Sequence, residues 1–261
     1  MPLSALLSVA ELTAQLETLG IRKGDILLVH SSLRTLGKVE GGAAGVLEAL
    51  KEVLGKDGTL VMPSFQSGSE YIFASRGICF DVKNTPAECG YLTEYFRQQE
   101  DTLRSLSSTH SMAAWGKHAG ELLQDHEKCL VTTGWGSPFE KLIDLGGKIL
   151  MLGAARGSNT TMHHLENTGG APTLCAIKFE TFVIMESGEK ICTPIHPHMP
   201  GLYRDYGKAI DLLEQIGGLS AGKVGNALCE LYDAQKLRTV VYGELRKNPC
   251  AFIKVFTPEK V

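Results

Sequence analysis

The sequence predicts an α/β fold with a mixed central sheet flanked by helices, followed by a C-terminal hairpin and further helices. Apolar runs of strand length occur at residues 26–30, 59–63 and 148–154, and such runs are typical of strands that are covered on both faces. A helical pattern of apolar residues at 43–54 separates the first two runs. Strands that alternate with helices indicate βαβ units and a largely parallel sheet.

The N-terminal third has further helix signals around these strands. Ser8 and Glu11 form a capping box at the start of a first helix. Residues 64–86 lose the periodicity and mix aromatic with small polar residues, as a binding loop inside a compact domain often does. A Thr-Pro pair at residues 85–86 then predicts a helix that ends near Arg97, with the threonine as its N-cap.

The middle of the chain continues this pattern. A short helix is expected at residues 119–125. Ser137, Pro138 and Glu140 form a second capping box with proline at the first helical position. After the third apolar run, the small polar residues at 159–161 supply N-caps for another helix.

The character of the sequence changes after residue 166. Residues 173–186 and 189–195 alternate around Ser187 and Gly188, which predicts a hairpin. Two helical patterns follow, and a last apolar segment fits either a helix or a strand. The helical patterns cover residues 205–216 and 223–237, and the last apolar segment covers residues 238–246. Because we find no repeat or linker, we expect a single α/β domain over residues 1–261, with 172–261 as a candidate C-terminal subdomain.

Composition narrows the class of protein. The 26 basic and 29 acidic residues give a net charge of −3, without the basic bias of a phosphate-backbone binder, so we expect no nucleic-acid partner. The N-terminus lacks the charged segment of a signal peptide and no apolar run could span a bilayer, so we expect no membrane association. Seven cysteines without a C-x-x-C pair favour a reducing cytoplasm. The sequence leaves the oligomeric state open.

His163 and Glu166 are the strongest chemical signal. They stand at i and i+3 of the helix expected after the third strand, so both lie on one face. A carboxylate that holds one imidazole nitrogen fixes the tautomer and raises the basicity, as a general base near neutral pH requires. The alternative is an ordinary exposed helix pair. Since ligands of open α/β sheets collect at the carboxyl ends of the strands, where this helix begins, a catalytic pair is favoured.

Other signatures of enzymes are missing. The sequence has no G-x-G-x-x-G after a strand, no P-loop, no G-x-S-x-G and no H-E-x-x-H. His163, His164, Glu166, His196 and His198 include the ligand types that zinc accepts, but the two adjacent histidines point about 100° apart on a helix. We therefore predict no metal, and a metal-dependent hydrolase that uses these histidines stays as an alternative.

Several stretches, taken together and in order, resemble the aminoglycoside 3-N-acetyltransferase family (antibiotic N-acetyltransferases). Each motif alone is weak, whereas the ordered set is fairly specific. The stretches are residues 30–33, 58–63, 85–90, 94–97, 104–105, 110–111, 136–139 with Leu142, and 160–163 with Glu166, followed by a weaker likeness at Gly225 and residues 248–252.

The resemblance implies transfer of an acetyl group from acetyl-coenzyme A (acetyl-CoA) to the 3-amino group of an aminoglycoside antibiotic. His163 would be the general base and Glu166 would orient it. Because no cysteine has a recognisable nucleophile setting, transfer would be direct. The coenzyme would be bound by Ser31, Ser32, Leu33, Arg34, Arg104, Ser111, Ser137, Pro138, Phe139 and Thr161.

The acceptor is less well defined. Tyr71 and Asp81, in the irregular segment, are the candidate acceptor-binding residues. Members of the family typically read Arg-Ser-x-His-Pro-x-His-Ser, whereas Ser107 and Ser108 replace the His-Pro pair here. Loss of the proline frees the backbone and loss of the imidazole removes a donor, which affects the placement of the acyl donor and of the acceptor. The alternatives are acylation of a different amine metabolite, or coenzyme binding without turnover.

Overall fold

The computed structural model describes residues 6–254. Two segments lie outside the described chain, residues 1–5 and residues 255–261. The first belongs to the N-terminus that we expect to lack a signal peptide, and the second is the end of the expected domain. Among the helices of residues 6–254, none is both long and apolar enough to cross a membrane.

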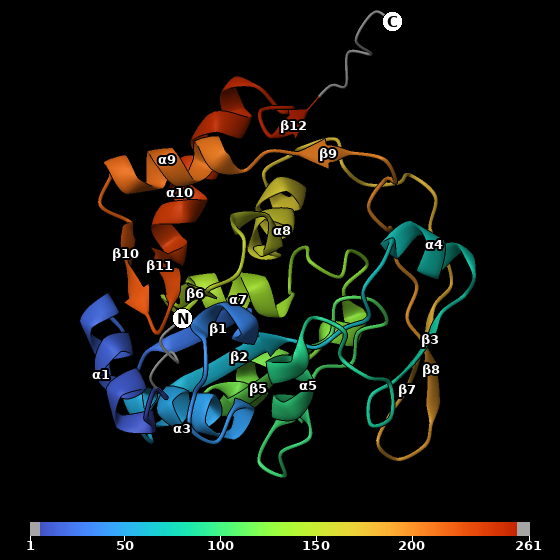
Figure 1. The fold of residues 1–261 in the computed structure, drawn as a ribbon. Coiled ribbons are helices and arrows are strands. Elements are labelled where there is room, and N and C mark those ends of the chain that lie inside the picture. The colour runs from blue at the N-terminus through green and yellow to red at the C-terminus, as the bar shows by residue number, and fades with distance from the viewer. Residues whose placement is uncertain (1–5, 255–261) are drawn as a thin grey trace, which may run out of the picture.

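A seven-stranded mixed sheet forms the centre of the molecule (Figure 1). Its strand order is β10-β11-β6-β1-β2-β5-β4. The central strand β1 pairs in parallel with both β2 and β6, while β4, β5, β10 and β11 pair antiparallel at the two sides. The strands of this sheet are β1 (Ile26–Ser31), β2 (Thr59–Pro63), β4 (Leu103–Arg104), β5 (Met112–Gly116), β6 (Lys148–Leu152), β10 (Leu219–Val224) and β11 (Ala227–Asp233).

Helices cover both faces of the sheet, which confirms the predicted fold class (Figure 1). In β1, Leu27 and Val29 pack into one apolar core, and Ile26 and Leu28 into the other. Helices α1, α3 and α5 contribute to the first core and α6 to α10 to the second. The helices are α1 (Val9–Leu19), α2 (Leu33–Leu36), α3 (Ala43–Leu54), α4 (Glu70–Ser75), α5 (Tyr91–Arg97), α6 (Ala119–Leu123), α7 (Pro138–Asp144), α8 (Thr161–Thr168), α9 (Gly207–Gln215) and α10 (Ala234–Lys247).

Two small sheets lie beside the central one. The first joins β3 (Cys79–Asp81), β7 (Phe182–Ile184) and β8 (Lys190–Cys192), and β7 and β8 form the hairpin predicted around residues 187–188. The second pairs β9 (Tyr203–Arg204) with β12 (Ile253–Lys254). The segment after residue 172 therefore supplies β7, β8, β9 and β12 as well as β10 and β11 of the central sheet.

The helix predicted to begin at Pro86, with Thr85 as its N-cap, begins instead at Tyr91. The Thr85 hydroxyl accepts a hydrogen bond from the Asp81 backbone N–H at 2.9 Å and so closes a turn after β3. The helix α5 starts after Gly90, whose φ of 124° few other residues adopt. The segment at 64–86 is also more ordered than expected, because it contains α4 and β3.

The helix predicted at residues 223–237 is wrong. Residues 219–233 form the antiparallel hairpin β10–β11, and only the following segment, α10, is helical. The turn contains Gly225 with φ 56°, and β11 pairs antiparallel with β6 along the side of the sheet. This long-range pairing outweighs the helical spacing of the apolar residues.

Candidate active site

The helix α8 begins at the carboxyl edge of the parallel strands. The chain leaves β6, passes through a short 3-10 turn at Arg156–Ser158 and enters α8, where Asn159 Oδ1 accepts a hydrogen bond from Thr161 N at 3.1 Å. His163 and Glu166 lie on one face of this helix, as predicted. The distance from His163 Nδ1 to Glu166 Oε2 is 3.5 Å.

The carboxylate of Glu166 also holds two residues from the C-terminal part of the chain. Arg204 Nε donates to Glu166 Oε2 at 2.8 Å, and the Tyr206 hydroxyl donates to the same oxygen at 3.0 Å. The Tyr206 oxygen lies 3.3 Å from His163 Nδ1. With the carboxylate on this side of the ring, Nδ1 carries the proton and Nε2 keeps its lone pair.

Burial sets the protonation state of this pair. Removal from water lowers the pKa of His163 to about 4, against the opposite effect of the hydrogen bond with Glu166. Burial raises the pKa of Glu166, but the hydrogen bond with His163 and the charge of Arg204 lower it by more. The imidazole is therefore neutral and the carboxylate ionised at pH 7. The pKa of His163 is therefore lowered overall, whereas the sequence suggested that the carboxylate of Glu166 would raise it.

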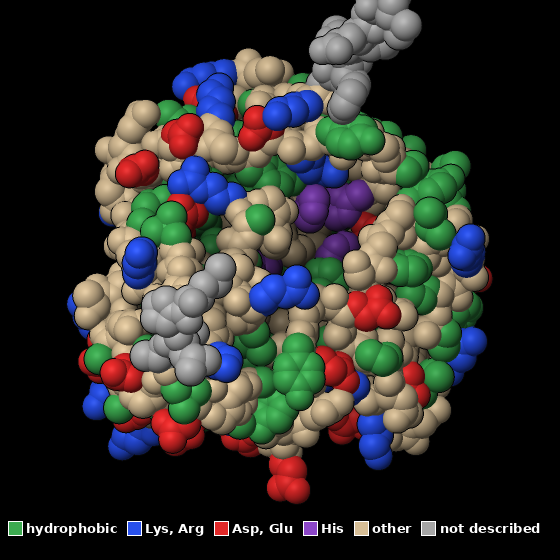
Figure 2. Space-filling view, viewed as in Figure 1, with side chains coloured by type: hydrophobic (Ala, Val, Ile, Leu, Met, Phe, Trp, Pro, Cys, Tyr) green, Lys and Arg blue, Asp and Glu red, His purple; other side chains and the backbone are tan. Residues whose placement is uncertain are grey.

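Histidines gather at the bottom of a hollow in the molecular surface (Figure 2). His163 lines two adjoining cavities. The first, which we call the histidine pocket, has a volume of about 210 Å³ and is lined by Gly68, Ser69, Glu70, His110, His163, His198, Met199, Pro200, Gly201, Leu202 and Arg204. The second, the side pocket, has a volume of about 360 Å³ and is lined by Arg156, Gly157, His163, Leu202, Arg204, Asp205, Tyr206 and Gly207.

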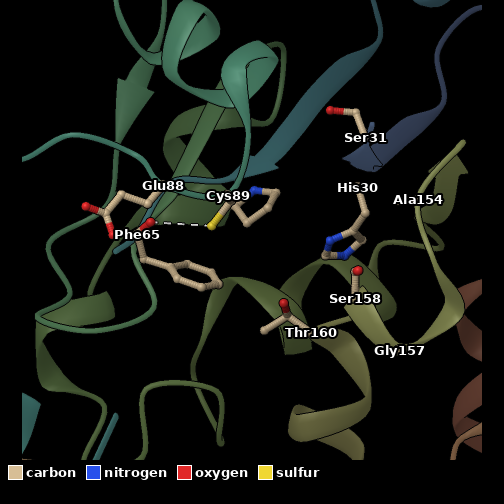
Figure 3. A pocket seen from close by; sticks show the side chains of 10 residues that line it. His30, Ser31, Phe65, Glu88, Cys89, Ala154, Gly157, Ser158 and Thr160 are labelled. Atoms are coloured by element: carbon tan, nitrogen blue, oxygen red, sulfur yellow. Dashed lines mark hydrogen bonds between the residues drawn. The ribbon is translucent and has the colours of Figure 1, made fainter. Parts of the chain in front are cut away.

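A third cavity, the strand-end pocket, has a volume of about 350 Å³ (Figure 3). Its walls come from the carboxyl ends of β1 and β2 and from the segments that follow β3 and β6. It is lined by His30, Ser31, Pro63, Phe65, Glu88, Cys89, Ala154, Gly157, Ser158 and Thr160. Gly157 lines this cavity and the side pocket, so the two are neighbours.

His30 is the notable side chain of the strand-end pocket. The residue is 4 % exposed, and its Nε2 is buried without a hydrogen-bond partner. Burial lowers the pKa of His30 to about 4. Its ring points toward Ser158 in Figure 3. A buried, neutral imidazole with a free nitrogen suits a polar but uncharged ligand group.

Glu70 is the centre of a buried network beside His163. Its Oε1 accepts hydrogen bonds from the hydroxyls of Thr109 and Thr132, both at 2.8 Å. Its Oε2 accepts from the backbone N–H of His198 at 2.8 Å and lies 2.5 Å from His198 Nδ1. His110 Nδ1 lies 3.2 Å from Oε1. Both carboxylate oxygens are therefore saturated with donors.

Glu70, His110 and His198 are a candidate metal site, because their ligand atoms lie within 4.8 Å of one another. Asn167 Nδ2 lies 3.0 Å from His198 Nε2, and Asn167 Oδ1 accepts from the Thr173 hydroxyl. These contacts make Nε2 the acceptor and Nδ1 the donor to Glu70. A metal ion at Nδ1 would require the opposite tautomer, so the network fits a proton between the two side chains better than a metal ion.

The residues predicted to bind the coenzyme are dispersed around the strand ends. Ser31 lines the strand-end pocket, Ser32 precedes α2, and Leu33 and Arg34 lie in its first turn, with Arg34 exposed. Thr161 is fully buried with an unpaired hydroxyl, and its neighbour Thr160 lines the pocket.

Ser111 and the start of α7 are buried. The Ser111 hydroxyl donates to the Ser105 carbonyl at 2.7 Å. Pro138 occupies the first position of α7, as predicted, and Phe139 packs in the apolar core. The Ser137 hydroxyl is buried without a partner and makes no capping bond. Glu140 accepts instead from the backbone N–H of Gly136, the residue before the N-cap, so the predicted capping box is not formed.

Arg104 holds backbone segments together. Its guanidinium donates to the carbonyls of Ser64, Val82 and Thr85 at 2.6 to 2.9 Å, and it lies over the ring of Phe80. Burial lowers the pKa of Arg104 to about 10. The residue is not among those that line the three cavities described above.

The two residues predicted to bind the acceptor lie apart from His163. The ring of Tyr71 packs edge-on against Phe179, with centroids 5.5 Å apart. Asp81 accepts hydrogen bonds from the backbone of Lys83 and Asn84 in the turn after β3. Neither lines the cavities described above, whereas Glu70, the neighbour of Tyr71, lines the histidine pocket.

The serines that replace the family His-Pro pair are also buried. The Ser108 hydroxyl accepts from Thr181 at 2.7 Å, and the Ser107 hydroxyl accepts from the His110 backbone N–H at 3.4 Å. Sequence reasoning missed Glu70, Arg204 and Tyr206 altogether. It named His198 only as one of several candidate zinc ligands.

The fold and the hollow at the carboxyl edge of its parallel strands have the layout of an α/β enzyme. A family model described as aminoglycoside 3-N-acetyltransferase matches residues 28–243. The chain is 30% identical over 260 residues to aminoglycoside N(3)-acetyltransferase III of Salmonella sp, with 91% of each chain covered. The chain belongs to the aminoglycoside 3-N-acetyltransferase family, and it is an acetyltransferase.

Solved structures agree with this assignment. The structure described as AAC-IIIb binary with CoASH has a TM-score of 0.82 and 26% identity, and covers 97% of this chain and 100% of that one. A mutant of aminoglycoside acetyltransferase AAC(3)-IVa in complex with a gentamicin has a TM-score of 0.83 and 26% identity, with 99% and 95% covered. This chain therefore shares its fold with solved relatives whose descriptions name a coenzyme, CoASH, and an aminoglycoside, gentamicin.

Proposed function

We propose that this protein transfers an acetyl group from acetyl-CoA directly to a primary amine, with His163 Nε2 as the general base. The observation that carries the proposal is the geometry of His163. Glu166 and Tyr206 hold its Nδ1, and the ring lines both the histidine pocket and the side pocket. A protonated amine cannot attack a thioester, so a base within hydrogen-bond reach is required.

The chemistry at His163 is a proton transfer coupled to acyl transfer. The amine nitrogen attacks the thioester carbonyl, a carbon–nitrogen bond forms, and His163 takes the proton that the nitrogen loses. The carbon–sulfur bond then breaks, and the imidazolium returns its proton to the leaving thiolate. Glu166, held by Arg204, stabilises the imidazolium while it exists.

The strand-end pocket is the proposed site of the pantetheine arm of acetyl-CoA. An uncharged arm fits its walls, which include the neutral His30. Ser31 lines this pocket, and the backbone of Ser32 and Leu33 together with Arg34 would meet the phosphates at its mouth. The relative solved with CoASH supports the choice of coenzyme.

The relatives suggest the acceptor by name. They are described as aminoglycoside N(3)-acetyltransferases, so the 3-amino group of an aminoglycoside is the first acceptor to test. A different amine is the second candidate, and the charges of the hollow described below favour it.

Thiol release from acetyl-CoA tests the proposal. Aminoglycosides with and without a free 3-amino group are assayed beside simple amines, with wild type, His163→Ala and His118→Ala. His118 forms a matched i, i+3 pair with the exposed Glu121, at 2.8 Å, away from the hollow. We expect a loss of roughly 10² or more for His163→Ala and none for His118→Ala. Equal losses, or an acetyl-enzyme trapped with acetyl-CoA alone, would overturn the mechanism.

A further inference from the structure

Among the residues that the structure describes, no unpaired carboxylate lines the hollow beside His163. Within residues 6–254, the carboxylates that line the histidine pocket and the side pocket are Glu70 and Asp205. Glu70 is saturated by its donors. Asp205 pairs with Lys254 at 2.9 Å and accepts from Gly207 N at 3.0 Å.

The arginines of the hollow are neutralised as well. Arg204 pairs with the buried Glu166 at 2.8 Å. Arg156 pairs with Glu230 at 2.6 Å and lies 3.6 Å from Asp211. The charged side chains that line the hollow are therefore paired with charges of opposite sign, and together they carry little net charge of either sign.

This electrostatic balance is unsuited to a polycation. Each ammonium group that leaves water needs a hydrogen-bonded anionic partner, or its burial is strongly unfavourable. An aminoglycoside brings several ammonium groups. If one of them bound at this site, the others would face charges that are already paired and would find no free anionic partner.

The histidine pocket does offer acceptors for a single amine. His110 Nδ1 lies 2.8 Å from the Thr132 hydroxyl and 3.2 Å from Glu70, so its remaining nitrogen, Nε2, is the atom that can accept from a ligand. His163 Nε2 is the second such atom. Both rings pack against His198, with centroid distances of 5.7 and 4.8 Å. A primary amine that binds in its neutral form has two N–H donors, one for each imidazole, and keeps its lone pair free to attack the thioester.

We propose that the acceptor is a small amine with a single amino group and an otherwise uncharged body, whose nitrogen is bound as the neutral amine between His110 and His163. This inference rests on the proposed acetyl transfer and narrows its acceptor. It makes His110 a substrate-binding residue and distinguishes this chain from relatives described as acting on aminoglycosides.

A comparison of matched amines tests this inference. Thiol release from acetyl-CoA is measured with ethanolamine and glucosamine, which have one amine, with 2-deoxystreptamine, which has two, and with kanamycin and gentamicin. We expect kcat/KM to be at least about tenfold higher for the better monoamine than for either antibiotic. We also expect its KM to change by less than about twofold between low and high salt, because no free carboxylate attracts it. Antibiotics as the best acceptors would overturn the inference.

Two variants sharpen the test. His110→Gln should raise the KM for the monoamine about fivefold, the effect of losing one hydrogen bond of about 1 kcal/mol, with the Kd for acetyl-CoA unchanged. Leu202 lines both pockets and is partly exposed, so Leu202→Glu supplies the missing carboxylate and should raise kcat/KM for kanamycin relative to the monoamine. The exposed Leu103 on β4 provides the control, since Leu103→Glu adds the same charge elsewhere and should leave this ratio unchanged.

The outcomes separate the inference from the function on which it rests. Thiol release that is fastest with antibiotics, or a KM unchanged in His110→Gln, contradicts the acceptor class alone. No thiol release with any amine, while calorimetry shows acetyl-CoA bound, contradicts the proposed transfer and the inference together.

Discussion

His163 Nδ1 lies 3.5 Å from Glu166 Oε2, one turn apart on α8, and Glu166 in turn receives Arg204 and Tyr206 on the same oxygen. The base is thus fixed by a carboxylate that is itself anchored from a distant part of the chain. Arg204 belongs to β9, which pairs with β12. The C-terminal part of the chain therefore helps to position Glu166 at the carboxyl edge of the sheet.

Replacement of Glu166 should affect both activity and stability. Glu166→Gln leaves the guanidinium of Arg204, 13 % exposed, without its counter-charge, and breaking a buried pair costs about 3–5 kcal/mol. We expect a loss of that order in the free energy of unfolding in urea, with kcat lowered at least tenfold. Glu121→Gln, in the exposed pair with His118, is the control and should change stability by less than about 0.5 kcal/mol. An equally stable Glu166→Gln would contradict the anchoring role.

Tyr206→Phe isolates the third contact. The variant removes a hydroxyl that donates to Glu166 at 3.0 Å and lies 3.3 Å from His163 Nδ1, while the ring keeps its packing. A net contribution of about 1 kcal/mol for such a hydrogen bond predicts a decrease in kcat of roughly fivefold, with the KM for acetyl-CoA unchanged. If kcat stays at the wild-type value, Tyr206 is only a packing residue.

The pH dependence of activity should reflect the low pKa of His163. Burial lowers this pKa to about 4, so the imidazole stays in its basic form throughout the range from pH 5 to 8. We expect no loss of kcat/KM for acetyl-CoA near pH 6.5 from protonation of this residue. Initial rates at constant ionic strength measure the profile. An inflection near pH 6.5 that disappears in His163→Gln would falsify the burial argument.

The buried histidines also predict how stability depends on pH. His30 and His126 are 4 % and 1 % exposed, and burial lowers the pKa of each to about 4 from an ordinary value of 6.5. The unfolded chain therefore binds more protons below pH 6.5, so the free energy of unfolding should fall as the pH drops from about 6.5 toward 4. Each residue contributes on the order of 3 kcal/mol at most. Urea denaturation at pH 7.5, 6 and 5 checks this, and a constant midpoint would argue against it.

Much of the fold follows from local sequence. Strands β1, β2 and β6 were predictable because both faces are covered, which leaves uninterrupted apolar runs such as Leu27 to Val29. The capping box of Ser8 and Glu11 is also present, with Glu11 N donating to the Ser8 hydroxyl at 3.2 Å. The hairpin β10–β11 was not predictable, because its place beside β6 depends on a pairing between distant segments.

The candidate site was likewise predictable only where its residues are close in sequence. The pair His163 and Glu166 could be predicted, because its members are one helical turn apart. The anchors Arg204 and Tyr206 lie 38 and 40 residues beyond Glu166 in the chain, and Glu70 lies 128 residues before His198. No periodicity links such positions, so only the folded chain reveals that they share one hollow.

The most direct test of the base is chemical rescue of His163→Ala. Thiol release from acetyl-CoA is followed with the best amine, with and without added imidazole, after calorimetry shows that the variant still binds the coenzyme. The mechanism predicts a kcat lower by roughly 10² to 10⁴, partly restored by imidazole, while His118→Ala neither loses activity nor responds to imidazole. A His163→Ala enzyme that turns over at the wild-type rate would contradict the mechanism.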